Sequence, residues 1–253
     1  MSGTLRVADI DTERLRALNS GQVQSRTLAE ALAIDQLALL HHVVPKAPAA
    51  LAEAVAGAQA LGILKRMQAT GAALQGLVPT ETLQDLALHP SDTVRGWLCF
   101  ANAASPGSQS VEPLLARIRP AADDPHFAVR EWAWMAARPI LAGDLEHSIG
   151  LLVPWTASTS ERIRRFASEA LRPRGVWARH IAELKLNPGL GLPLLEPLRA
   201  DNARYVQDSV ANWINDAAKT NPDWARDLGR RWDRESPSPA TGRITARALR
   251  SLS

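Results

Sequence analysis

Three carboxylates, Glu131, Glu169 and Asp216, are the residues of this 253-residue sequence best placed to do chemistry together. Glu169 is the clearest case, because the segment RIRRFASEALRPRGVW at residues 162–177 contains no other acid. Carboxylates gathered on one surface can stabilise a developing positive charge, and one of them can orient or deprotonate a water molecule. The helices that carry the three residues decide whether they meet.

The charge around Glu169 is strongly positive. Residues 160–180 hold six arginines and two acids, which gives a local charge of +4, whereas the whole chain carries only +3. Such a patch is the electrostatic footprint that a polyanion such as nucleic acid needs. The alternative is a solvated helix face in a chain where arginine outnumbers lysine 25 to 4.

The elements that carry these residues are predicted to be helical, because apolar residues recur every three or four positions. Several segments share a polar turn, a β-branched anchor residue, and a small or apolar residue four positions later. The anchors are Val94, Val129, Ile163 and Val206, spaced 35, 34 and 43 residues apart, with Ile244 as a weaker fifth. These periods predict an all-α, HEAT-like α-solenoid, which is a curved superhelix of helical pairs. A generic helical bundle is the alternative.

We expect residues 1–253 to form a single domain, with a helical cap over about residues 1–80 and HEAT-like repeats over 81–253. Within the cap, the segment at residues 26–44 has a helical period. Thr27 and Glu30 stand at the spacing of a capping box, and Pro45 closes the segment. This pattern predicts one helical segment.

Helical geometry predicts which side chains share a face. Counted from each anchor, positions 0, +4 and +7 form the core stripe, and positions +2, +6 and +10 form a second stripe beside it. Glu131 lies at +2, Glu169 at +6 and Asp216 at +10 of their units. Parallel stacking of these helices would therefore produce an acidic cluster on a basic, concave face. The alternative is that each acid forms an exposed ion pair worth about 0 to 1 kcal/mol.

The composition argues against several other classes of protein. The single Cys99 excludes an intramolecular disulfide framework, and there is neither an apolar run near twenty residues nor a secretory signal. We therefore expect a cytoplasmic protein without a membrane span. His41 and His42 are adjacent and cannot share a helix face, and NPGLGLP at residue 187 lacks the pattern of a dinucleotide loop. We expect no metal or other cofactor, and we interpret NPGLGLP as an interhelical turn.

The tryptophans divide by their position in the repeats. Trp97 and Trp132 at +3 and Trp213 at +7 lie on or beside the core stripe, which favours packing over stacking on nucleic acid. Trp177 follows Arg174 in a predicted loop. It is the tryptophan that we expect to contact nucleic acid.

Three segments carry a resemblance to a known family. They are VREWAW with the RP that follows it, IRRFASEALRPRGVW, and LPLLEPLRADNARYVQDSVANWINDAAKTNPD. In these segments the chain resembles the HEAT-like DNA alkylation-repair glycosylases, and the AlkC branch more than the AlkD branch. The similarity is weak before residue 80 and strongest over residues 124–232. Its most specific parts are Ala-Ser-Glu before Arg-Pro-Arg, and Asn-Asp before KTNPD.

The resemblance implies a DNA glycosylase that excises cationic N-alkylated bases such as 3-methyladenine, with 3-methylcytosine as a further candidate, and that uses no cofactor. The acidic site residues of the family match Glu131, Glu169 and Asp216; Glu169 or Asp216 is expected to be the main stabiliser, with Glu131 supporting it. The partner would be double-stranded DNA containing alkylated bases, bound by a monomer. The residues expected to bind DNA are Arg138, Arg164, Arg165, Arg172, Arg174, Trp177, Asn212 and Lys219.

The implied reaction suits these residue types. A base alkylated on a ring nitrogen already carries a positive charge, so it can leave as a neutral molecule without a general acid. Carboxylates would then stabilise the oxocarbenium character that grows on the deoxyribose. Arginines on the same face would bind phosphates and fix the register without reading the sequence. AlkD-like members place aromatic residues beside the lesion, and Trp134 and Trp177 are the candidates for that role here.

Some AlkC-like proteins also carry an immunoglobulin-like carboxy-terminal domain, whereas this sequence stops at Ser253 with no strand-rich extension. The resemblance therefore leaves tight DNA binding and the full substrate range open. Two other functions are alternatives: a non-catalytic HEAT-repeat module that binds DNA or protein, and a glycosylase specific for bulky alkyl adducts. The carboxylates favour catalysis, because a protein that only binds phosphate gains nothing from acids facing it.

Overall fold

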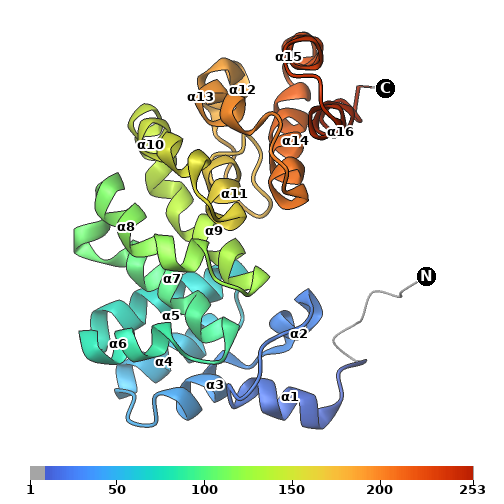
Figure 1. Ribbon diagram of the computed structural model, residues 1–253. Helices are drawn as coiled ribbons and strands as arrows, with labels where there is room; N and C mark the ends of the chain where they lie inside the picture. Colours follow the sequence, from blue (N-terminus) through green and yellow to red (C-terminus); the bar gives the residue numbers. More distant parts are fainter. Residues whose placement is uncertain (1–8, 253) are drawn as a thin grey trace. The chain divides into compact units, whose positions relative to one another are not determined.

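The computed structural model describes residues 9–252 (Figure 1). These residues divide into two compact units. The first unit contains the chain up to Gln109 together with Pro125–Ala136, and the second contains Ser110–Asp124 together with the chain from Ala137. Helices and their connections make up the whole described part of the chain, which confirms the all-α prediction. None of these helices is both long and apolar enough to cross a bilayer. The single domain with a cap before residue 80 stays a prediction.

The first unit is formed by the helices before residue 110 and by the first part of α9. Its helices are α1 (Thr12–Asn19), α2 (Leu28–Ala33), α3 (Gln36–Val43), α4 (Ala49–Ala58), α5 (Ile63–Leu77), α6 (Thr80–Ala87), α7 (Asp92–Ala104) and the 3-10 helix η2 (Pro106–Ser108). The helix α9 (Phe127–Gly143) gives residues 127–136 to this unit. α5 packs so closely along α7 that a Cβ on Gly71 would lie only 2.6 Å from the backbone oxygen of Trp97.

The segment at residues 26–44 forms two helices, so the prediction of one continuous segment is wrong. Thr27 does cap α2, because its hydroxyl oxygen accepts a hydrogen bond from the N–H of Glu30 at 3.2 Å. Asp35 then caps α3 by accepting two hydrogen bonds from the backbone N–H groups of the next turn. A side chain that caps a new helix competes with continuation of the old one, and the apolar period does not reveal this break.

Asp92, at the start of α7, fixes the chain that leads into α2. Its carboxylate accepts hydrogen bonds from the N–H and the hydroxyl of Ser25 at 2.8 and 2.6 Å. The Nε2 atom of His126 lies 2.7 Å from the carbonyl oxygen of Ser25. Ser25 and Asp92 are both buried, so these bonds satisfy polar groups that water does not reach.

The second unit contains the repeats that carry Glu169 and Asp216. Its helices are α8 (Val111–Ala122), the end of α9, α10 (Leu145–Leu152), α11 (Glu161–Glu169), α12 (Ala182–Leu186), α13 (Leu192–Leu195), α14 (Arg204–Ala218), α15 (Pro222–Glu235) and α16 (Pro239–Ala248), joined in part by the 3-10 helices η3 (Val153–Ala157), η4 (Pro188–Gly191) and η5 (Glu196–Leu198). α14, orange in Figure 1, packs against both α11 and α16. These three helices therefore form a layer in which matching positions become neighbours.

Burial confirms the repeat pattern. The five anchors are each no more than 2% exposed: Val94, Val129, Ile163, Val206 and Ile244. The residues four positions after them are buried as well: Leu98, Ala133, Ala167, Val210 and Ala248. Complete burial of an aliphatic side chain contributes about 1.5 to 3 kcal/mol to stability, so the anchor stripe is a main source of cohesion between the helices.

The packing role expected for three tryptophans is confirmed. Trp97, Trp132 and Trp213 are all buried. The indole N–H of Trp213 donates to the carbonyl oxygen of Leu171 at 3.0 Å, which joins α14 to the end of α11. The NPGLGLP segment forms η4 and the start of α13. Its Gly191 lies against the Trp213 ring, where a Cβ would collide with the indole, so this glycine is required by packing.

Candidate active site

Glu169 and Asp216 are brought together by the packing of α11 against α14. Glu169 ends α11, and Asp216 lies near the carboxyl end of α14. Arg172, just after α11, joins them: its Nη1 donates to Glu169 Oε1 at 2.7 Å, and its Nε and Nη2 donate to Asp216 Oδ2 at 3.0 and 2.8 Å. All three residues are buried. The two carboxylates therefore share one guanidinium.

The second oxygen of Glu169 is held from α14. The hydroxyl of Ser209 donates to Glu169 Oε2 at 2.7 Å, and Arg165 Nη2 lies 3.6 Å from the same oxygen. The Ser209 hydroxyl also lies 2.8 Å from that of Ser168. The guanidinium of Arg165 stands over the ring of Tyr205, 4.5 Å from its centre. Glu169 is thus fixed by partners on both of its oxygens.

The second oxygen of Asp216 has a weaker partner. Lys219 Nζ lies 3.5 Å from Asp216 Oδ1, which is long for a charge-assisted hydrogen bond, and the Lys219 side chain is 46% exposed. Arg174 donates through Nε to the backbone oxygen of Asp216 at 3.3 Å, not to the carboxylate. Among the four carboxylate oxygens of this pair, Asp216 Oδ1 is therefore the one most open to a new cation.

The electrostatic balance keeps Glu169 and Arg172 charged. Burial raises the pKa of Glu169, but the positive charges of Arg165 and Arg172 and the Ser209 hydrogen bond outweigh it, so the pKa lies below its ordinary value of 4.5. Burial lowers the pKa of Arg172, but the two carboxylates outweigh that effect and raise it. Glu169 and Arg172 are consequently both ionised at neutral pH.

Arg138, in α9, lies beneath the turn after α11 and is only 3% exposed. Its guanidinium donates to the carbonyl oxygens of Ala170, Arg172 and Arg179 at 2.8, 2.6 and 3.1 Å. Burial lowers the pKa of Arg138 to about 10, and the nearby positive charge of Arg172 adds to this effect. A guanidinium committed to three carbonyls does not present itself to a phosphate. We therefore replace its expected DNA contact with a structural role in shaping this turn.

Three other residues expected to bind DNA are paired within the protein. Arg172 holds the two carboxylates. Arg164 donates to both oxygens of Asp201, at 2.6 and 3.0 Å. Asn212 accepts a hydrogen bond from Arg250 Nη2 at 3.0 Å. Of these, Arg172 is buried, so its bonds favour a role in ordering the carboxylates over a contact with phosphate.

The loop after Pro173 leaves Trp177 at the surface. Trp177 is 50% exposed, and its φ of +56° lies in the left-handed region that residues with bulky side chains rarely adopt. Gly175 lies so close to Arg138 that a Cβ on it would be 3.2 Å from the Arg138 Cζ. The buried arginine and the glycine thus help to fix the backbone that presents Trp177. Its contact with DNA stays a prediction.

Glu131 belongs to the part of α9 that lies in the first unit. Its Oε2 accepts a hydrogen bond from the indole N–H of Trp134 at 2.7 Å. Trp134 is 1% exposed, so it is not available to stack on a lesion, and we no longer assign it that role. The role of Glu131 as a third carboxylate stays a prediction.

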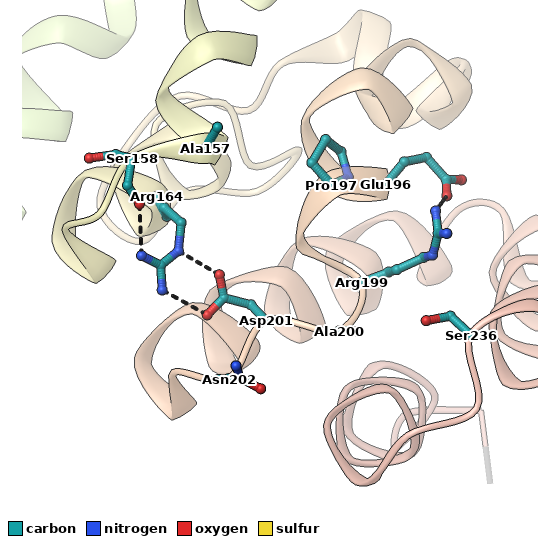
Figure 2. A pocket seen from close by; sticks show the side chains of 10 residues that line it. All are labelled: Ala157, Ser158, Arg164, Glu196, Pro197, Arg199, Ala200, Asp201, Asn202 and Ser236. Atoms are coloured by element: carbon teal, nitrogen blue, oxygen red, sulfur yellow. Dashed lines mark hydrogen bonds and ion pairs between the residues drawn. The ribbon is translucent and has the colours of Figure 1, made fainter.

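A pocket of about 530 Å³ in the second unit contains none of the three carboxylates (Figure 2). The charged side chains that line it are paired, because Arg164 binds Asp201 and Arg199 binds Glu196 at 3.1 Å. This pairing leaves the pocket without an excess of charge that would identify a ligand. Within residues 9–252, no three His, Cys, Asp or Glu side chains gather closely enough to hold a metal ion.

Ser209 is a partner of Glu169 that was not predicted from the sequence. Ser209 lies at anchor +3 of its repeat, where the three preceding repeats have Trp97, Trp132 and Phe166. The sequence does contain a sign of this role: a small polar residue replaces a large aromatic one at a position that borders the core. Polar residues that are buried need a hydrogen-bond partner, and the neighbouring helix offers a carboxylate.

Comparison with solved structures identifies related folds. The alkylpurine DNA glycosylase AlkC of Pseudomonas fluorescens, solved bound to DNA containing an abasic site analog, matches 98% of this chain with a TM-score of 0.71 and 26% identity. AlkD2 of Streptococcus mutans matches 79% of this chain and 97% of its own, with a TM-score of 0.61 and 19% identity. The protein smu.31 of Streptococcus mutans UA159 gives a TM-score of 0.60 at 20% identity, over 78% of this chain and 95% of its own.

Sequence comparison reaches a shorter part of the chain. The uncharacterized protein YhaZ of Bacillus subtilis (strain 168) is 41% identical over 117 residues, which is 46% of this chain and 32% of YhaZ. This chain also spans only 65% of the AlkC chain that it matches. No family model matches the sequence.

The stacked helices and their buried anchors define a HEAT-like helical-repeat protein. Within that class, its fold resembles that of AlkC over nearly the whole chain, and that of AlkD2 over most of it. The resemblance that the sequence indicated is thereby confirmed.

Proposed function

We propose that this protein is a DNA glycosylase that hydrolyses the N-glycosylic bond of cationic N-alkylated bases in double-stranded DNA. The observation that carries the proposal is the buried pair Glu169 and Asp216, ordered by a single arginine. The similarity to AlkC, which is an alkylpurine DNA glycosylase, supports it. We expect 3-methyladenine and related bases as substrates, with 3-methylcytosine as a second candidate.

The proposed reaction needs stabilisation of a cation and a positioned water molecule. The bond between C1′ of the deoxyribose and the base nitrogen breaks, and its electron pair goes to the base, which leaves uncharged. Positive charge then grows on C1′ and the ring oxygen, where a nearby carboxylate stabilises it. Water adds to C1′ and gives its proton to a carboxylate or to solvent.

We assign Asp216 as the main stabiliser and Glu169 as the residue that supports it. Within the described part of the chain, the partner of Asp216 Oδ1 is Lys219, at 3.5 Å, so a growing positive charge can approach this oxygen without breaking a short hydrogen bond. Both oxygens of Glu169 already accept hydrogen bonds at 2.7 Å. Glu169 therefore acts mainly through Arg172, and Glu131 remains our third, supporting carboxylate.

The side chains around this pair suit a nucleic acid backbone. Lys219 is exposed beside Asp216, and Arg174 contacts the backbone oxygen of Asp216. Trp177 is exposed in the same turn region as Arg174. We propose that these residues, together with Arg165, contact the DNA near the damaged nucleotide. Binding by a monomer, in the cytoplasm, completes the proposal.

The test is the release of free bases from methylated DNA. We would incubate the protein with methylated duplex and measure 3-methyladenine, 7-methylguanine and 3-methylcytosine by chromatography. Wild-type protein is expected to release 3-methyladenine, and Glu169→Gln is expected to release much less. Glu161→Gln is the matched control, because Glu161 begins the same helix and is exposed.

Absence of release by the wild type, with binding to duplex DNA intact, would contradict the proposal and favour a binding module or an enzyme for bulky adducts. Equal loss in Glu169→Gln and Glu161→Gln would show that the assay reports charge alone. A melting curve for each variant separates loss of catalysis from loss of fold.

A further inference from the structure

Three arginines near the carboxyl end of the chain form a row that the sequence analysis did not assign. Arg243 and Arg247 are one helical turn apart on α16, and Arg250 follows in the turn after the helix. We call these three residues the α16 arginine row. α16 buries Thr241, Ile244 and Ala248 elsewhere on its surface, so the row does not belong to the core stripe.

The row is held against α14 by polar contacts. Asp208 accepts a hydrogen bond from Arg243 Nη2 at 2.7 Å and forms an ion pair with Arg247, whose Nε lies 2.9 Å from Asp208 Oδ1. Asn212 accepts from Arg250 Nη2 at 3.0 Å. The row thus lies along the Asp208–Asn212 edge of α14.

The same edge of α14 leads to the proposed reaction site. Asp208, Asn212 and Asp216 follow each other at intervals of four residues, so they stand on successive turns of one face. With about 1.5 Å of rise per residue, Asp208 lies about 12 Å from Asp216 along the helix. That distance corresponds to about three or four phosphates along one DNA strand. A duplex whose damaged nucleotide is held at Asp216 and whose axis follows α14 would therefore extend over this row.

The row carries more positive charge than the protein neutralises. Arg243 and Arg247 share one carboxylate, that of Asp208. The two terminal nitrogens of Arg247 donate no hydrogen bond within residues 9–252, and its side chain is 44% exposed. Ion pairs this exposed contribute about 0 to 1 kcal/mol, so stability alone does not account for the row.

We propose that the α16 arginine row binds the phosphate backbone of double-stranded DNA on one side of the damaged nucleotide. The proposal rests on the function proposed above, because it places that nucleotide at Asp216. No large apolar side chain is exposed on α16, which argues against a membrane surface as the partner. Asp208 positions the arginines, and the unpaired nitrogens of Arg247 point to a contact that is completed by phosphate oxygens.

The test compares two double variants that remove the same charge. Arg243→Gln/Arg247→Gln removes two members of the row. The control, Arg230→Gln/Arg234→Gln, removes two arginines at the same spacing on α15, on the side opposite the buried Ala225 and Trp232. The measurement is the dissociation constant for undamaged duplex DNA, by fluorescence anisotropy, as salt rises from about 50 to 200 mM.

Removing the two row arginines is expected to weaken duplex binding about tenfold and to lower the salt slope by about 2, irrespective of DNA sequence. The control is expected to keep the wild-type slope. Equal effects of the two variants, or a wild type whose duplex binding does not depend on salt, would overturn the proposal. Base release at saturating protein, measured on the same preparations, reports separately on the glycosylase function, because undamaged DNA tests the row without excision.

Discussion

Arg172 donates two hydrogen bonds to one oxygen of Asp216, Oδ2, at 3.0 and 2.8 Å, and leaves the other oxygen to Lys219 at 3.5 Å. This unequal arrangement orients the Asp216 carboxylate through Oδ2 and leaves Oδ1 without a short hydrogen bond. Glu169 receives the third nitrogen of the same guanidinium at 2.7 Å. The site is therefore ordered before any substrate binds, and electrostatic stabilisation depends on such preorganisation.

Asp216→Asn removes the negative charge but keeps the shape that Arg172 contacts. Because Asp216 Oδ1 is the oxygen assigned to the growing cation, we expect the single-turnover rate of 3-methyladenine release to fall by about 10²- to 10³-fold. Duplex binding should be preserved. Asp227→Asn on α15, an exposed acid, is the control, and a drop of equal size in the control would contradict the assignment.

Arg172→Met leaves two buried carboxylates without their shared cation. Breaking a buried ion pair by removing one partner destabilises a protein by about 3 to 5 kcal/mol, and we expect a loss of that order in the free energy of unfolding, measured with urea. Adding Glu169→Gln and Asp216→Asn to Arg172→Met removes the unpaired charges and should restore part of the loss. No restoration would mean that Arg172 stabilises the fold by packing and not by charge.

The lowered pKa of Glu169 predicts a dependence of stability on pH. Because the folded pKa lies below the ordinary 4.5, the unfolded chain binds more protons in this range, and stability rises with pH. The contribution is fully present above the unfolded pKa and is lost as the pH falls through the folded pKa. Urea unfolding between about pH 3 and 6 should show a weaker pH dependence for Glu169→Gln than for the wild type.

Glu30 provides an internal comparison for that measurement. Its pKa is lowered mainly by the hydrogen bond from Arg14, so it adds to the same pH dependence from the first unit. Glu30→Gln should therefore weaken the pH dependence of unfolding without slowing base release. A Glu169→Gln variant with the full wild-type pH dependence would contradict the lowered pKa of Glu169.

Ser209→Ala removes the hydroxyl that fixes Glu169 Oε2 from α14. A hydrogen bond to a charged group contributes about 1.5 to 3 kcal/mol, so we expect a loss of that size in the free energy of unfolding. Ser168→Ala is the matched control, because Ser168 contacts Ser209 but not the carboxylate. Equal losses in the two variants would mean that Ser209 acts through packing alone.

The repeat pattern could be predicted because it depends on local periodicity. A β-branched anchor with a small residue four positions later marks a helix face that must be buried, and all five anchors, including the weaker Ile244, are buried. The same counting placed Glu169 and Asp216 on the same stripe of neighbouring repeats, and the packing of α11 against α14 makes them share Arg172. Regular helix geometry is therefore sufficient to predict that two residues more than 40 positions apart lie on the same side of neighbouring repeats.

The partners of individual arginines could not be predicted from the sequence. Arg138, Arg164 and Arg172 look alike in the sequence, yet each has a different set of acceptors: carbonyl groups, Asp201, and the carboxylate pair. Which acceptor an arginine reaches depends on turn geometry after the helix ends. The apolar period of a sequence predicts helices, but it does not predict the geometry of the turns that follow them.

The most direct test of the central claim is the single-turnover release of 3-methyladenine by the double variant Glu169→Gln/Asp216→Asn. Wild-type protein is expected to release the base and leave one abasic site for each base released. The double variant is expected to bind the same duplex and to release base no faster than the DNA does alone. Release by the double variant at the wild-type rate would contradict the account, because the reaction would then not depend on the carboxylates that Arg172 orders.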